Sequence, residues 1–96
     1  MYNEVKNHET ERLGYSMAIW QVELDSRDVS QYRKKLKNRG FISASYFSYN
    51  GFDLEKMRKL AKEGKIDAMR CVIGKSIRWY YLEQQAEFAR LKGELY

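Results

Sequence analysis

The spacing of hydrophobic and polar residues divides this chain of 96 residues into short strands and helices. In residues 15–24 hydrophobic side chains alternate with polar ones, which predicts a half-buried strand. Residues 26–38 place hydrophobic side chains on one face of a helix, and Ser26 stands where its N-cap is expected. Residues 1–14 show no hydrophobic period, so we expect a flexible tail there and a single domain over residues 15–96.

A helix-turn-helix is predicted in residues 43–63. Ser43 is expected to cap a first helix over residues 44–49, and Gly51 then allows a tight turn. Asp53 is expected to cap a second helix with hydrophobic residues on one face and Lys and Arg on the other. Two helices joined by a turn of about three or four residues present a helix to the major groove of DNA. DNA is therefore the first partner to consider.

The C-terminal third of the chain predicts a wing and a closing helix. Residues 66–72 and 76–81 have the composition of strands, and Gly74 lies in the short segment that joins them as a hairpin. Residues 82–91 predict an amphipathic helix, with Phe88 considered among its inward-facing side chains.

These elements predict an α+β fold with a winged helix-turn-helix over residues 41–84 and a strand-helix extension before it. A second arrangement stays open because residues 41–49 alternate well enough to form a strand. That strand would give a βαβαββα two-layer sandwich and would remove the helix-turn-helix. The caps and the turn glycine agree in one register, which favours the winged helix.

The charge of the chain favours a polyanionic partner. Eighteen Lys and Arg against 13 Asp and Glu give a net charge of +5, and the excess is concentrated in residues 33–39 and 56–65. Clustered cations attract phosphates and release counterions from nucleic acid. The cations of residues 33–39 are candidates to extend such a phosphate footprint.

The single cysteine and the absence of long apolar runs indicate a cytoplasmic protein. Because Cys71 is the only cysteine, an intrachain disulfide is excluded, and its apolar neighbours predict that its side chain is buried. No segment reaches the roughly 20 apolar residues that cross a bilayer, and the N-terminus does not resemble a signal peptide. We therefore expect no membrane partner.

Cations of the second helix and of the hairpin are the candidate DNA contacts. Lysine and arginine pair with guanine acceptors and with phosphate oxygens, whereas Glu55 either accepts from cytosine or complements the helix dipole. Lys75 stands at the tip of the predicted wing, where it can contact the backbone. The residues that we expect at the DNA are Glu55, Lys56, Arg58, Lys59, Lys62, Arg70, Lys75 and Arg78.

Other chemistry finds little support in the sequence. Trp79 and Tyr81 share one face of a strand and Tyr80 the other, so at least two of the three are expected in the core rather than stacked on unpaired bases. His8 has no second histidine, which argues against a zinc site. No nucleophile, metalloprotease, phosphate-loop or dinucleotide motif occurs, so we expect a protein without catalysis, metal or cofactor.

The motifs of residues 41–70 resemble the MerR-type and phage excisionase-type winged helix domains. Gly51 stands at the turn glycine of those families, Phe52 at the apolar position that follows, and Asp53 at the cap. Residues 63–66, Glu-Gly-Lys-Ile, match the element that leads into the wing. The chain departs from the pattern where Tyr46 and Phe47 replace the small residues of the first helix. The resemblance implies a DNA-binding protein of a phage or other mobile element, either a recombination directionality factor or a transcriptional regulator.

A protein-binding function is the competing hypothesis. The chain has 8 Tyr and 2 Trp, residue types that often anchor protein interfaces. Such a protein would inhibit or redirect a host protein, and its basic surface would mimic or block a nucleic-acid site. Self-association, or contact with a recombinase or another protein, also remains open for the N-terminal strand.

Overall fold

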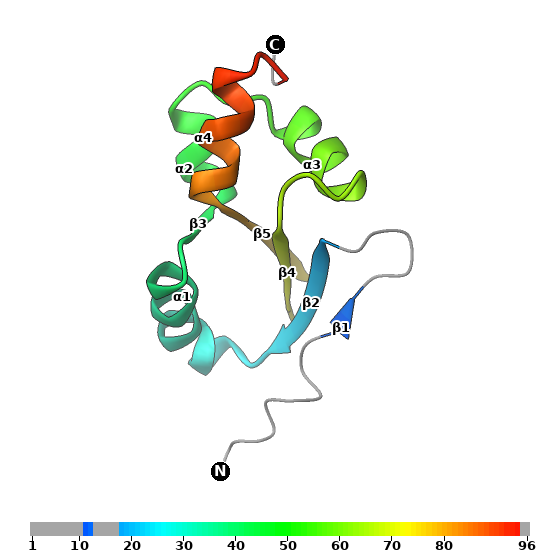
Figure 1. Cartoon of the computed structure of the whole chain (residues 1–96). Coiled ribbons are helices and arrows are strands. Elements are labelled where there is room, and N and C mark those ends of the chain that lie inside the picture. Colours follow the sequence, from blue (N-terminus) through cyan, green and yellow to red (C-terminus); the bar gives the residue numbers. More distant parts are fainter. Residues whose placement is uncertain (1–10, 13–17, 95–96) are drawn as a thin grey trace.

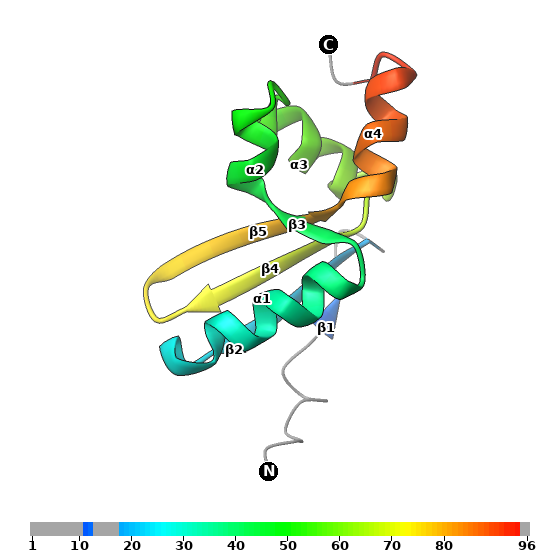
Figure 2. The same ribbon diagram turned by 90° about the vertical axis from the view of Figure 1, so that its left-hand side faces the viewer.

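A mixed sheet forms the centre of the molecule, and helices cover both of its faces (Figures 1 and 2). The computed structural model describes residues 11–12 and 18–94. The strands follow the order β1-β2-β4-β5-β3, in which β2 and β4 are parallel and the other neighbours antiparallel. Their bounds are Glu11–Arg12 (β1), Ile19–Leu24 (β2), Phe41–Ser43 (β3), Ala68–Ile73 (β4) and Ser76–Leu82 (β5).

One helix lies on one face of the sheet, and three lie on the other (Figure 2). Helix α1 covers the first face, and α2, α3 and α4 gather on the opposite face. A short 3-10 helix, η2, precedes α1. The helices span Ser26–Asp28 (η2), Val29–Asn38 (α1), Ala44–Tyr49 (α2), Leu54–Lys62 (α3) and Glu83–Leu91 (α4). The α+β class predicted from the sequence is therefore confirmed.

The strands are buried on both faces where helices cover them. Val22 of β2 packs in the cluster that contains Leu36 of α1. Ile19, three residues earlier and on the opposite face of β2, packs in the cluster that contains Met57 of α3. The predicted half-buried strand is confirmed: Trp20, Val22 and Leu24 pack on the α1 face, whereas Gln21 and Glu23 on the other face are half-buried and exposed, respectively. Ile19, at the start of β2, is the exception, because it packs in the cluster that contains α3.

The segment after α1 is both strand and helix, so it contains a feature of each of the two arrangements left open by the sequence. Phe41–Ser43 pairs with the end of β5, and the chain then turns directly into α2 at Ala44. The predicted helix over residues 44–49 is confirmed, whereas a strand that continues to residue 49 is wrong, because β3 ends at Ser43. Strand β3 is therefore present as the second arrangement expects, but it has only three residues, and two helices rather than one follow it before β4.

Local predictions at three other places are corrected by the structure. Asp25, rather than Ser26, caps η2, since its side chain accepts from the Arg27 N–H. Two residues of the predicted tail, Glu11 and Arg12, form β1, and the remainder of that tail lies outside the described part. Phe88 points outward with 61% of its surface exposed, because Ala86 and Ala89 provide the buried side of α4.

The Phe47 ring is the centre of the larger core cluster. It is fully buried and makes edge-to-face contacts with Phe52, at 5.1 Å between ring centroids, and with Tyr81, at 6.0 Å. It thereby joins α2, the turn after α2 and strand β5. The aromatic residue that departs from the small residues of the winged helix families is thus what holds the first helix to the sheet.

Replacing Phe47 by Ala should destabilise the protein by about 3–5 kcal/mol, because the change removes a buried ring and leaves a cavity. Phe88→Ala is the matched control, since it removes the same ring from an exposed position and should change stability by no more than about 0.5 kcal/mol. Denaturant unfolding of both variants measures the difference. Equal losses of stability in the two variants would contradict the assigned core.

The protein should lose stability at alkaline pH. Burial raises the pKa of the Cys71 thiol to about 12, and it also raises the pKa of Tyr80 and of Tyr81 above the ordinary tyrosine value. Because the folded state holds these protons more tightly than the unfolded chain, the contribution of these three groups to the free energy of unfolding should be constant below about pH 8 and fall as the pH rises above it.

Denaturant midpoints at a series of pH values measure this effect, with Cys71→Ala as the control. The variant should show a smaller loss of stability between about pH 8 and 10, where the unfolded thiol ionises but the unfolded tyrosines mostly do not. A midpoint that rises over the same range would contradict burial of these groups.

Candidate nucleic-acid interface

Helices α2 and α3 are joined by a tight turn that backbone hydrogen bonds fix. The Gly51 N–H donates to the Ser48 carbonyl oxygen and the Phe52 N–H to the Phe47 carbonyl oxygen, at 3.1 and 2.9 Å. Gly51 adopts φ of +86°, a conformation that other residues rarely take. Phe52 then turns inward against Phe47. The turn predicted from the glycine and from the apolar residue after it is therefore present.

The two helices begin differently. The Asp53 side chain accepts from the backbone N–H groups of Glu55 and Lys56, at 3.0 and 3.2 Å, so the predicted cap of α3 is confirmed. The Ser43 side chain makes no capping hydrogen bond, and its hydroxyl lies 3.1 Å from the Ser45 hydroxyl instead. The start of α2 is set by β3 pairing with β5, since Ser43 is still part of that strand.

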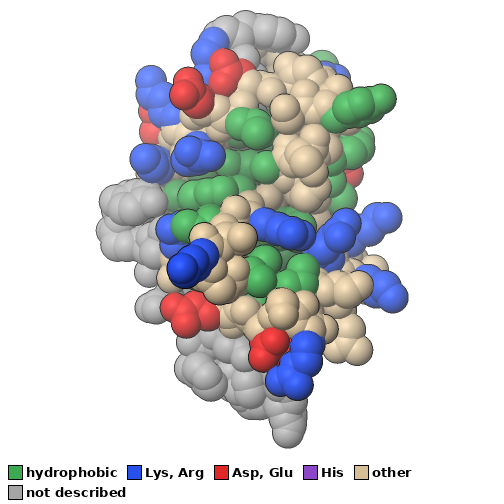
Figure 3. Space-filling model, turned by 180° about the vertical axis from the view of Figure 1, so that it is seen from behind, with side chains coloured by type: hydrophobic (Ala, Val, Ile, Leu, Met, Phe, Trp, Pro, Cys, Tyr) green, Lys and Arg blue, Asp and Glu red, His purple; other side chains and the backbone are tan. Residues whose placement is uncertain are grey.

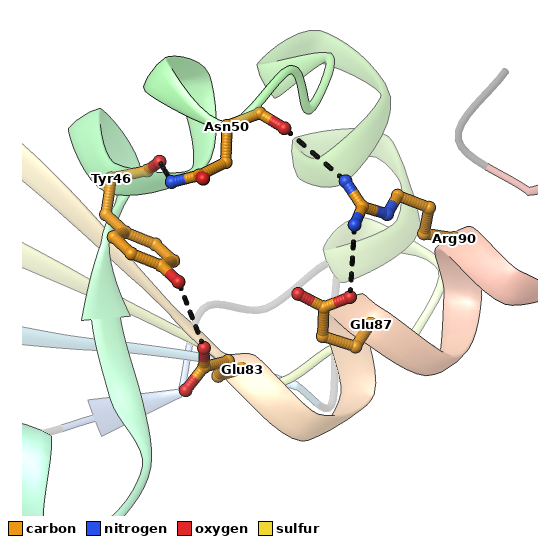
Figure 4. A network of polar contacts seen from close by, with 5 residues as sticks. All are labelled: Tyr46, Asn50, Glu83, Glu87 and Arg90. Carbon is orange, nitrogen blue, oxygen red and sulfur yellow. Dashed lines mark hydrogen bonds and ion pairs between the residues drawn. The ribbon is translucent and has the colours of Figure 1, made fainter.

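Helix α4 holds the turn from the other side (Figure 4). The Arg90 guanidinium donates to the Asn50 carbonyl oxygen at 3.4 Å, lies 4.5 Å from the centroid of the Phe52 ring and pairs with Glu87 at 3.6 Å. The Tyr46 hydroxyl donates to the Glu83 carboxylate at 3.4 Å. These contacts join α4 to Tyr46 within α2 and to Asn50 at the end of α2.

Helix α3 presents a charged side away from the core. Met57, Leu60 and Ala61 are buried against the sheet and α2. The predicted contact residues divide into those on the outward side and those on its flanks. Glu55, Lys59 and Lys62 are exposed on the outward side, Lys56 is half-buried on one flank, and Arg58 is exposed on the other.

Arg58 is held between α3 and the hairpin. Its guanidinium lies 5.2 Å from the centroid of the Trp79 ring, a distance at which a cation is attracted to the aromatic face. The nearby cation also acts against the rise that burial causes in the pKa of Tyr81. Arg58 therefore joins the helix to β5, a role that its position on the helix alone did not predict.

The β4–β5 hairpin projects past α2 and α3 (Figure 2). A two-residue turn, Gly74-Lys75, joins the strands, with Gly74 at φ of +61° and Lys75 exposed at the tip. Arg70 and Arg78 lie on opposite faces of the sheet, since Arg70 pairs in register with Trp79, and Arg78 with Cys71. The hairpin therefore does not bring these two arginines together as one support for Lys75.

Each arginine of the hairpin belongs to a different surface. Arg70 donates a hydrogen bond to the Gln21 side chain of β2, on the face that also carries α3. Arg78 is exposed on the face that α1 covers, next to Tyr80. Of the two, Arg70 shares the sheet face of the α3 cations.

The aromatic run of β5 divides between the two faces as predicted. The rings of Trp79 and Tyr81 are nearly parallel with centroids 6.1 Å apart, whereas Tyr80 is buried in the cluster on the α1 face. Tyr80 and Tyr81 are core residues. Trp79 is half-buried, and its ring contacts Tyr81 and Arg58.

Seen from behind, Lys and Arg side chains lie on several sides of an apolar band (Figure 3). Ile77 of β5 contributes an exposed apolar side chain on the α3 face of the hairpin, with 47% of its surface accessible. Cations and exposed apolar side chains therefore occur side by side on this surface. Such a surface suits a partner that offers both phosphate charge and apolar groups.

The sequence shows a run of cations in α1 but does not show that three of them line one hollow. Arg33, Lys34 and Lys37 of α1 line a hollow of about 300 Å³ beside β3. Their helical spacing is visible in the sequence, but the hollow depends on pairing between β3 and β5, which are distant in sequence. No local signal could have placed these three side chains around one space.

The described residues include no group of three or more His, Cys, Asp or Glu side chains arranged to hold a metal ion. His8 lies outside the described part. Within the described ranges, no helix has the length and apolar character needed to traverse a bilayer.

Comparison of the chain with protein-family models, curated proteins and solved structures found no match. Functional assignment therefore depends on the geometry of α3, the hairpin and the α1 hollow.

Asp53→Ala should destabilise the protein by about 1 kcal/mol, because two N–H groups at the start of α3 lose their acceptor. Ser43→Ala is the matched control at the start of α2, where no such bond exists. Its destabilisation should be within about 0.5 kcal/mol. Thermal or denaturant unfolding compares them, and an equal or larger destabilisation by Ser43→Ala would show that the caps have been assigned the wrong way round.

Proposed function

We propose that this protein binds double-stranded DNA without catalysing a reaction, with α3 in the major groove and the hairpin tip on the adjacent backbone. The main support is the order of elements along the chain: two helices joined by a tight turn, the second of them cationic, are followed by a projecting hairpin with Lys75 at its tip. A cytoplasmic protein of this kind would regulate transcription or set the direction of recombination, as the resemblance to MerR-type and excisionase-type domains suggests.

The division of α3 into two sides supports the proposal. Lys59 and Lys62 are exposed, whereas Met57 and Leu60 attach the helix to the core. A recognition helix needs an outward side free of core contacts and a rigid attachment on the other, because base and phosphate contacts require fixed positions. Glu55 lies in the first turn, where its charge also complements the helix dipole.

A protein partner is the second candidate, and the edge of β5 favours it. Strand β3 pairs only with Tyr80, Tyr81 and Leu82 of β5. The outer edge of residues 76–79 is therefore unpaired within the described part, beside exposed Ile77. An open edge with an apolar side chain accepts an added strand from another protein or from a second copy of this chain.

Binding to a fluorescent duplex of mixed sequence, measured at two salt concentrations, tests DNA binding. Wild type should bind, and its affinity should fall steeply with salt. Changing Lys56, Lys59 and Lys62 together to Ala should weaken binding. The same change should reduce the slope of log affinity against log salt by up to about 0.9 for each phosphate that the variant no longer neutralises.

The matched control changes Arg27, Lys35 and Lys92 to Ala, which removes the same charge from exposed positions outside α3 and the hairpin. This variant should retain the wild-type slope within about 1 unit. Equal weakening of binding in both variants would indicate attraction by net charge alone. Absence of binding by wild type would exclude the proposed function and direct attention to the β5 edge.

A further inference from the structure

A hollow beside α1 is lined by cations from one helix and by hydroxyl and apolar groups from the sheet. It has a volume of about 300 Å³, the lower end of the range for small-molecule sites. Its lining consists of Ser30, Arg33, Lys34, Lys37, Phe41, Ile42, Ser43 and Tyr80. No carboxylate is among these residues.

The three cations of the hollow have no carboxylate partner among the described residues. Ion pairs elsewhere in the described part join Arg27, Lys65, Arg90 and Lys92 to acidic side chains, whereas Arg33, Lys34 and Lys37 take part in none. Like charges on one helical side repel one another, which costs stability. A bound anion would relieve that repulsion.

Tyr80 adds a hydroxyl group to this surface. Burial raises the pKa of Tyr80, so its hydroxyl stays protonated at neutral pH and can donate a hydrogen bond. The guanidinium groups of Arg33 and Arg78 lie close enough to act against that rise.

We infer that the α1 hollow binds the phosphate of a nucleotide. Convergent Lys and Arg side chains with hydroxyl donors are complementary to phosphate oxygens. The volume exceeds what a phosphate ion alone would fill, and Phe41 and Ile42 offer apolar contact to the rest of the ligand. The nucleotide is either free or the end of a nucleic-acid strand, since both present the same phosphate chemistry.

This site is separate from the surface that α3 presents. Tyr80 and Phe41 belong to the cluster on the α1 face, whereas α3 packs on the other face of the sheet. The inference therefore goes beyond the proposed function and does not depend on it. Disabling one site should leave the other intact.

Titration of the ¹⁵N-labelled protein with AMP, with inorganic phosphate and with a single-stranded oligonucleotide bearing a 5′-phosphate tests the inference. Saturable shifts of amides in α1 and β3 are expected with AMP. Arg33→Gln combined with Lys34→Gln should weaken AMP binding by about tenfold or more, because the change removes two charge-assisted hydrogen bonds to phosphate. Stronger binding of the oligonucleotide than of AMP would identify a strand end as the source of the phosphate.

The matched control is Lys35→Gln combined with Arg39→Gln, which removes two charges from exposed positions outside the lining. It should bind AMP as wild type does, and circular dichroism should show that both variants are folded. Unsaturable shifts with every ligand, or equal weakening in the two variants, would overturn the inference. Saturable shifts with phosphate but no gain from AMP would overturn the nucleotide part and leave an anion site.

Discussion

The buried ring of Phe47 holds helix α2 and the turn after it against the sheet. Helix α2 has only six residues and α3 nine, and isolated helices shorter than about 12–15 residues are marginal in water. Their stability must therefore come from tertiary packing. Phe47 provides it by touching Phe52 after the turn and Tyr81 of the sheet. The ring thus holds α2 and the turn before α3 to the sheet, while Met57 and Leu60 attach α3 itself.

The two-sided sheet separates the two candidate binding surfaces. On one face, α2, α3 and α4 pack together, and Arg58 on the flank of α3 contacts Trp79 of the hairpin. On the other, packing of α1 leaves a hollow between its cations and the edge strand β3. Because β5 contributes to both faces through alternate residues, Trp79 and Tyr80 serve different surfaces although they are adjacent in sequence. Separation on opposite faces is what makes the two proposals independent.

Much of the helix-turn-helix could be predicted because its signals are local. The Asp53 cap, the Gly51 turn and the spacing of Met57 and Leu60 each depend on residues within a few positions, and all three are present. The strand at Phe41–Ser43 was less accessible, since it exists only through pairing with β5. Helix α2 follows β3 without a loop. The pattern of hydrophobic residues therefore could not show where the strand ends and the helix begins.

The candidate site was predictable as a set of cations but not as a geometry. Lys59 and Lys62 lie outward as helical spacing indicates, whereas Arg58 contacts Trp79 from a strand that is distant in sequence. Arg70 and Arg78 lie close together in the sequence, yet strand alternation places them on opposite faces of the sheet. The contacts of Arg90 with Asn50 and Phe52 likewise exist only because α4 packs beside the turn between α2 and α3. Such contacts arise from tertiary packing, which a single sequence does not display.

Mapping the amides that shift when a DNA duplex is added to the ¹⁵N-labelled protein tests the central claim most directly. The claim is that α3 and the hairpin form one DNA-binding surface attached to the sheet through Phe47. The largest shifts should lie in residues 55–62 and around Lys75, with little change in α4. Shifts confined to other elements, or no shifts with duplex at low salt, would contradict it.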